Sequence, residues 1–144
     1  MYFEDIEPGD KFTSRPRMVT PTDIDAFAIS TGAVNPLFLD DNSARKLGFE
    51  RRIAPGLLTL SLTVGLVYAL GLFDHVIALM HIDVNFLASV NTGDEIKSTV
   101  EVIEKRETKH PERGIAILKV NSQNQDGKPV LEITNLACLI RYKS

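Results

Sequence analysis

The stretch 31–41, TGAVNPLFLDD, has the composition of a buried active-site loop. It combines small residues, the Asn35-Pro36 turn and an apolar flank. An acid and a base would be sought in such a loop, but the two positions where we look for them hold Ala33 and Phe38. Neither a methyl group nor a phenyl ring can accept or donate a proton. The loop therefore raises the question of whether this protein performs chemistry or only binds a ligand.

Three other ionisable side chains are candidates for proton transfer. Asp40 lies near the end of this loop, although Asp before a short helix is more often an N-cap than a catalyst. His81 and Asp83 share one face of a predicted strand and could form a hydrogen-bonded pair. Such a face more often meets solvent or an interface. The sequence leaves both interpretations open for each of these residues.

The composition favours a single cytoplasmic domain, 1–144, with no nucleic-acid partner. A chain of 144 residues is long enough to bury one core. A net charge of −3 offers no basic field for nucleic acid. The single cysteine, Cys138, excludes an internal disulfide and lies in an apolar run, as a buried, inert thiol would. The first five residues lack the pattern of a signal peptide.

The uncharged stretch Ile53–Phe73 has two interpretations. It is long enough to cross a bilayer, for which about 20 apolar residues are needed. A helix buried on nearly all sides within one domain also reads as apolar all round. Glycines, hydroxyl residues and Pro55 dilute the hydrophobicity, and the sequence after the stretch is strand-like. We therefore expect a long buried central helix and no membrane association.

The remaining elements predict an α+β protein. Thr20-Pro21-Thr22-Asp23 starts a helix that Gly32 ends, and Asp41, Asn42 and Ser43 can cap a short helix through Leu47. Alternation or apolar runs predict strands at 82–86, 96–103, 115–120 and 130–142, with a further strand within 11–19 and a hairpin turn at Asp126-Gly127. We expect an antiparallel sheet wrapped around the central helix. Its open edge predicts at least a dimer.

Nearly the whole chain resembles the MaoC-like (R)-specific enoyl-CoA hydratases and dehydratases, which have the hot-dog fold. The resemblance covers FEDIEPGDKF, DIDAFAISTGAVNPLFLDDNSARKLGF, RRIAPGLLTLSLTVGL, IDVNFLASVNTGDEI and NQDGKPVLE. The family motif Gly-Asp-x-Asn-Pro-x-His-x-Asp stands here as GAVNPLFLD, residues 32–40. Its scaffold residues match, but Ala33 and Phe38 replace the carboxylate and the imidazole. Pro55-Gly56 replaces the His-Gly of many members.

The resemblance implies a mechanism that this chain cannot follow in the usual way. In the family, the Asp and His hold and activate one water, and a backbone N–H near the start of the central helix polarises the thioester carbonyl. Positioned acid–base groups contribute about 10²–10⁴-fold to a rate. Two roles stay open for Gly56: its amide donates a hydrogen bond to a thioester carbonyl, or the residue simply allows close helix packing. Phe38 makes the pocket drier, which suits an acyl chain and opposes water activation.

The resemblance also places a set of substrate-binding residues around this pocket. Arg51 and Arg52 could meet CoA phosphates at its mouth, or they could form a solvated pair. Ser61 and Thr59 either line the pocket or bond back to the helix backbone, and we favour the backbone. The predicted binding residues are Asn35, Pro55, Gly56, Leu57, Ser61, Arg51 and Arg52, with no metal site and no cofactor beyond the CoA or carrier-protein thioester.

We expect an acyl-thioester-binding protein without ordinary hydratase activity, either a homo-oligomer or the non-catalytic subunit beside an intact MaoC-like relative. The alternative is an active hydratase or dehydratase that uses Asp40 or the His81–Asp83 pair. A thioesterase ranks lower, because the central helix carries no carboxylate between Gly56 and Phe73.

Overall fold

The computed structural model describes residues 1–144. Its elements, in chain order, are η1 (Phe3–Asp5), β1 (Lys11–Thr13), β2 (Arg17–Met18), α1 (Pro21–Thr31), α2 (Pro36–Leu39), α3 (Asp41–Lys46), α4 (Gly56–Tyr68), β3 (Val76–Phe86), β4 (Glu95–Arg106), β5 (Arg113–Gln123) and β6 (Pro129–Arg141).

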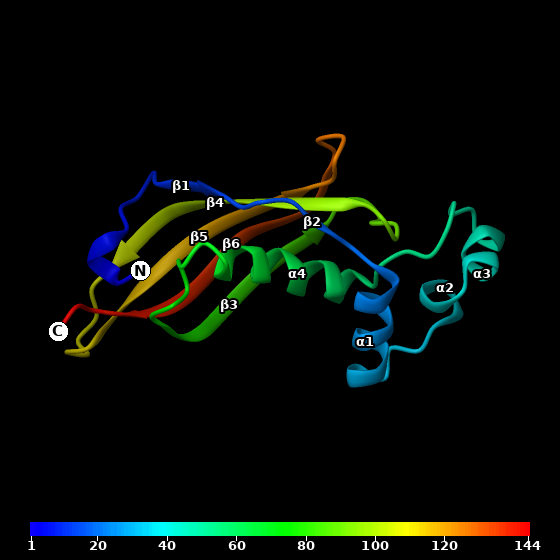
Figure 1. Cartoon of the computed structure of the whole chain (residues 1–144). Helices are drawn as coiled ribbons and strands as arrows, with labels where there is room; N and C mark the ends of the chain where they lie inside the picture. The colour runs from blue at the N-terminus through cyan, green and yellow to red at the C-terminus, as the bar shows by residue number, and fades with distance from the viewer.

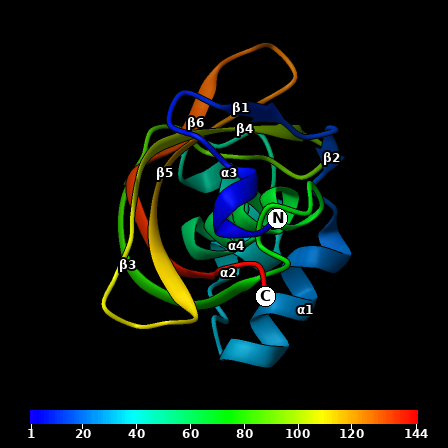
Figure 2. The same ribbon diagram turned by 90° about the vertical axis from the view of Figure 1, so that its left-hand side faces the viewer.

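The strands form one antiparallel sheet in the order β1-β4-β5-β6-β3, and the short β2 also pairs with β4. Figure 1 shows α4 lying along this sheet, and the end-on view in Figure 2 shows the sheet curving around the helix. The N-terminal segment contributes two short strands, as two separate pieces of the predicted strand within 11–19. The predicted α+β arrangement of a sheet wrapped around a central helix is confirmed.

Helix α4 is shorter than the uncharged stretch that predicted it. It begins at Gly56, directly after Pro55, and ends at Tyr68. The chain then turns through Gly71, whose φ of 76° lies in the left-handed region that favours glycine. Its 13 residues span about 20 Å at the usual helical rise. None of the helices combines the length and the hydrophobicity that crossing a bilayer requires.

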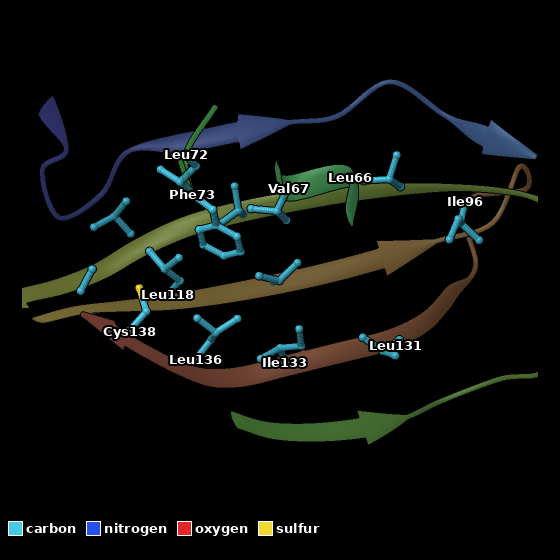
Figure 3. Close-up of a cluster of buried hydrophobic side chains, with 14 of the residues drawn as sticks. Leu66, Val67, Leu72, Phe73, Ile96, Leu118, Leu131, Ile133, Leu136 and Cys138 are labelled. Carbon is cyan, nitrogen blue, oxygen red and sulfur yellow. The ribbon is translucent and has the colours of Figure 1, made fainter. Parts of the chain in front are cut away.

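The core lies between the second half of α4 and the inner face of the sheet. Figure 3 shows Leu66, Val67, Leu72 and Phe73 meeting side chains from the strands, including Leu118, Leu131, Ile133, Leu136 and Cys138. The Cys138 side chain is 1% exposed, and this burial raises the pKa of its thiol to about 11. The thiol therefore stays protonated near neutral pH, and the predicted inert role is confirmed.

Three short helices lie beyond the N-terminal end of α4, away from both chain termini (Figure 1). Helix α1 begins with the predicted cap: the Thr20 hydroxyl accepts a hydrogen bond from the Asp23 amide, and the Asp23 carboxylate accepts one from the Thr20 amide. Gly32 ends α1 with a φ of 79°. The Asn35-Pro36 pair, interpreted as a turn from sequence, instead starts the extra helix α2.

Strand β3 forms an open edge of the sheet. Ile82 and Val84 are half-buried between exposed neighbours, as predicted, but Phe86 is 51% exposed, and the strand begins earlier, at Val76. Its only neighbour is β6. Along its first half, Ile77, Leu79 and Met80 are each about half exposed. An apolar strand edge of this kind can pair with another strand, which is the basis of the predicted dimer.

Candidate functional site

A cavity of about 420 Å³ lies at the N-terminal end of α4. Its wall is formed by α2, by the start of α4, and by the 53–54 segment together with the end of β3 and the following 87–90 segment, where the Ala54 amide donates to the Val90 carbonyl oxygen. Its twelve lining residues are Leu37, Phe38, Ile53, Ala54, Gly56, Thr59, Phe86, Leu87, Ala88, Ser89, Val90 and Val130. The cavity is of the size and apolar character that small ligands occupy.

The first residue of α4, Gly56, lies directly against the Phe86 ring at the end of β3. A β-carbon at Gly56 would lie 3.1 Å from Phe86 Cε1, which is tighter than ordinary packing. The absence of a side chain therefore lets the aromatic ring approach the helix start. Amide groups in the first turn of a helix have no intrahelical acceptor, and the helix dipole gives this end a partial positive charge. The Gly56 amide is thus a built-in donor at the cavity wall.

Arg52 fixes the loop that covers the cavity. Its Nε donates to the Phe38 carbonyl oxygen at 2.7 Å, and its Nη2 donates to Asp25 Oδ1 at 2.5 Å. Its backbone amide donates to Asp41 Oδ1 at 2.9 Å. These bonds tie α1, α2 and α3 to the segment before α4. The Arg52 side chain is only 13% exposed, so it is a structural clamp in this chain and not a solvated cation.

Arg51 is also engaged within the chain. Its Nε donates to the Thr92 carbonyl oxygen at 2.6 Å, and Nη2 lies 3.5 Å from the buried Asp94 carboxylate. A third contact joins Nη1 to Glu50 at 3.0 Å. Arg51 therefore anchors the turn before β4. Contact of either arginine with CoA phosphates stays a prediction, and it would compete with these existing bonds.

Ala33 and Phe38, which replace the acid and the base of the family motif, lie on either side of Asn35. The Asn35 side chain caps α2 by accepting from the Leu37 amide at 3.1 Å. Phe38, inside α2, is one of the residues that line the cavity. Ala33 is half-buried, is hydrogen-bonded through its amide to the Thr31 hydroxyl, and does not line the cavity. No ionisable side chain is among the twelve that line the cavity.

Asp40 is placed as a helix cap. Its carboxylate accepts from the Ser43 hydroxyl at 2.7 Å and from the Ser43 amide at 2.8 Å. The hydroxyl and the amide of Ser43 hold the pKa of Asp40 below its ordinary value. A carboxylate with a lowered pKa is a weaker base, and Asp40 does not line the cavity. The geometry thus gives Asp40 the N-cap role.

His81 and Asp83 form the pair that their spacing suggested. His81 Nε2 lies 3.1 Å from Asp83 Oδ2, and both side chains are more than half exposed. They lie on the edge strand β3 and do not line the cavity. The pair therefore exists, but in a single chain it is not assembled with the Gly56 amide.

Of the α4 residues considered as ligand contacts, Gly56 and Thr59 line the cavity, whereas Leu57 and Ser61 do not. Ser61 donates to the Leu57 carbonyl oxygen at 2.8 Å, as the backbone interpretation expected, and Leu57 is 62% exposed. Neither lines the cavity. Thr59, for which we had also favoured a bond to the backbone, lies in the cavity wall instead. Its spacing of three residues from Gly56 was the available signal, since such residues share a helix face.

A curved antiparallel sheet wrapped around one central helix, with a cavity at the start of that helix, defines this protein as a hot-dog fold. The sequence profile of the MaoC like domain matches residues 5–124. The chain belongs to the MaoC-like domain family.

Three proteins illustrate the likeness. A "Monoamine oxidase regulatory protein" from Archaeoglobus fulgius is 38% identical, with a TM-score of 0.88 over 100% of this chain and 96% of that one. The mitochondrial 3-hydroxyacyl-[acyl-carrier-protein] dehydratase of Arabidopsis thaliana is 35% identical over 65% of this chain and 55% of its own. The 3-hydroxybutyryl-CoA dehydratase of Methylorubrum extorquens is 34% identical over 72% of this chain and 65% of its own. The chain thus spans less than two thirds of these two curated relatives.

Proposed function

We propose that this protein binds acyl thioesters in the cavity at the start of α4 and lacks ordinary enoyl-thioester hydratase activity. The observation that carries the proposal is the cavity wall itself. It retains the Gly56 amide, a donor suited to a thioester carbonyl, but none of its side chains is an ionisable acid or base.

The apolar wall supports the binding half of this proposal. Nine of the twelve lining residues are hydrophobic, so an acyl chain would replace water at a favourable surface. Two of the relatives described above act, by name, on 3-hydroxyacyl thioesters, one carried by acyl-carrier protein and the other by CoA. Both carriers present the same thioester chemistry, and we propose the thioester as the shared ligand.

The missing proton-transfer groups support the second half. Hydration of an enoyl thioester requires a base for the water and a proton for the α-carbon, and positioned groups supply about 10²–10⁴-fold. Phe38 brings hydrocarbon to the place where the family resemblance expects an imidazole. The Arg52 bond to the Phe38 carbonyl oxygen holds this residue in position.

The open edge of β3 supports assembly with a second chain. We propose either a homodimer or a complex with an intact MaoC-like subunit, in which this chain binds or positions a substrate for its partner. Co-purification from the native cell, followed by a hydration assay with and without the recovered partner, separates these two arrangements.

The direct test restores the missing groups. The wild-type protein and the double variant Ala33→Asp, Phe38→His are assayed with crotonyl-CoA and with the crotonyl carrier-protein thioester. The wild type is expected to turn over far below the usual enzyme range of about 1 s⁻¹ and above, and the double variant to gain at least about 10²-fold. A variant of similar size without proton-transfer groups, Ala33→Asn with Phe38→Gln, is the control and should gain nothing. Wild-type turnover above about 1 s⁻¹ contradicts the proposal.

A second candidate is a hydratase that uses unusual groups, and the 3.1 Å His81–Asp83 contact favours it. This candidate requires a partner chain to enclose the exposed edge strand. If wild-type hydration is found, His81→Ala should abolish it, whereas Asp40→Asn tests the other carboxylate. Activity that survives both substitutions removes these two assignments.

A further inference from the structure

The segment 33–49, which carries α2 and α3, covers the cavity although little of it is buried. Figure 1 shows both helices beyond the N-terminal end of α4, outside the curved sheet. Ala44 is the only fully buried residue of this segment, and Phe38 is the only one that packs against the main hydrophobic cluster. Leu37 and Phe38 also line the cavity. Elements with few buried contacts open more readily than the core.

Arg52 supplies the hydrogen bonds that connect the middle of this segment to the rest of the chain. Its Nε donates to the Phe38 carbonyl oxygen at 2.7 Å, and its backbone amide donates to Asp41 Oδ1 at 2.9 Å. The other hydrogen bonds that leave the segment 33–49 join its ends to residues directly beside them, which are Thr31, Gly32 and Glu50. Loss of the Arg52 bonds would therefore free the whole segment between its two ends.

Arg52 is itself held by parts of the chain outside this segment. Its Nη2 donates to Asp25 Oδ1 of α1 at 2.5 Å, and a bond between two charged groups is stronger than a neutral one. The Thr92 amide donates to the Arg52 carbonyl oxygen at 2.9 Å, and the next residue, Ile53, forms a β-bridge with Asn91. The guanidinium group is thus positioned independently of the segment that it contacts.

A glycine in the left-handed region lies near each end of the segment. Gly32 follows α1 with a φ of 79°, and Gly48 lies after α3 with a φ of 93°. Both are exposed, and a β-carbon at either would meet nothing within 4 Å, so no neighbouring group fixes them in place. Glycine adopts positive and negative φ about equally well, and hinge motions are absorbed by a few residues at the ends of elements. The two glycines can therefore act as hinges.

We propose that residues 33–49 form a hinged cover that opens to admit a ligand, and that Arg52 is the positioning residue that holds this cover closed. Opening breaks the Arg52 bonds to Phe38 and Asp41 and moves Phe38 out of the cavity wall. Closing returns Phe38 to the wall and withdraws the ligand from water. The inference rests on the proposed thioester-binding function for its ligand, whereas the motion of the cover is a property of the free protein.

Hydrogen–deuterium exchange of the free protein, followed by mass spectrometry, tests the motion. Arg52→Met removes the side-chain donors and keeps an unbranched side chain. It should speed exchange of residues 33–49 by about tenfold or more, because a lost bond to a charged donor shifts the cover toward its open form. Exchange in β5 and β6 should stay unchanged. The matched control is Arg17→Met, which removes a bidentate pair with Asp23 outside the cover and should not alter exchange of residues 33–49.

Stopped-flow binding of butyryl-CoA to the same variants separates a gate from a fixed wall. A gate that is open more often lets ligand enter and leave faster, so both the association and the dissociation rate constants should rise in Arg52→Met, each by about threefold or more. A residue that only supports the wall would change dissociation and leave association unchanged or slower. The control Arg17→Met should match the wild type in both rate constants.

The outcomes separate this inference from the proposed function. Unchanged exchange of residues 33–49 in Arg52→Met overturns the inference. Faster exchange that extends through β5 and β6 also overturns it, because Arg52 would then support the fold as a whole. An association rate constant that does not rise overturns the gating role. Absence of butyryl-CoA binding to the wild type contradicts the proposed function and the gating role, while the exchange measurement still decides whether Arg52 holds the cover.

Discussion

The two ends of α4 have opposite surroundings although the sequence of the helix is uncharged throughout. At the C-terminal end, Leu66 and Val67 are packed against the sheet within the main core (Figure 3). At the N-terminal end, Gly56 and Thr59 face a cavity of about 420 Å³. One buried helix can therefore pack as core at one end and line a binding cavity at the other. Fold stability and ligand binding should therefore respond to separate substitutions.

The largest expected effect is at the packed end. Leu136 is 1% exposed in the cluster around α4, and Leu136→Ala should lower the free energy of unfolding by about 2–5 kcal/mol. The matched control is Leu57→Ala on the exposed face of α4. This substitution should change the free energy of unfolding by less than about 0.5 kcal/mol. Chemical denaturation measures both. Equal losses in the two variants would show that the packed end is not where the stability resides.

The cavity end should respond in binding and not mainly in stability. Gly56→Ala places a β-carbon 3.1 Å from the Phe86 ring, and this ring can move because it is about half exposed. We expect the displaced ring to narrow the cavity and to weaken acyl-thioester binding by about tenfold or more, with a loss of unfolding free energy of about 1 kcal/mol or less. Calorimetric titration and denaturation of the same sample measure the two effects.

The smallest effect has the opposite sign. Gly65 lies in the same helix, and a β-carbon there would meet nothing within 4 Å. Gly65→Ala should raise the free energy of unfolding by about 0.5–1 kcal/mol, because alanine has the higher helix propensity. Its thioester affinity should equal that of the wild type. If Gly65→Ala weakened binding as much as Gly56→Ala does, the proposed location of ligand binding at the N-terminal end of α4 would be contradicted.

Local signals in the sequence predicted the elements that local chemistry determines. Thr20 and Asp23 form the expected cap, Gly32 ends α1 in the left-handed region, and Gly127 supports the hairpin turn. The first half of β3 was missed because the chain bulges there. Its register against β6 shifts between Val76 and Ala78 and again between Leu79 and His81, so the side chains do not alternate regularly.

The candidate site was only partly predictable because its contacts join distant residues. Gly56 was expected at the helix start, but its close approach to Phe86 depends on the path of β3. The Arg52 bonds to Phe38 and Asp25 also join different elements, and sequence alone gave this arginine the character of a ligand-binding or solvated cation. Thr59 lines the cavity because of the segments that surround the start of α4, and the helix sequence alone does not show their position.

The most direct test of the central claim follows the Gly56 amide by ¹H–¹⁵N nuclear magnetic resonance while butyryl-CoA and then crotonyl-CoA are added to the wild-type protein. The account predicts a large, saturable shift of the Gly56 resonance with both ligands, as a new hydrogen bond to the thioester carbonyl forms, and no conversion of crotonyl-CoA to its hydrated product. A Gly56 resonance that stays unchanged at saturation, or rapid appearance of 3-hydroxybutyryl-CoA in the same tube, would contradict it.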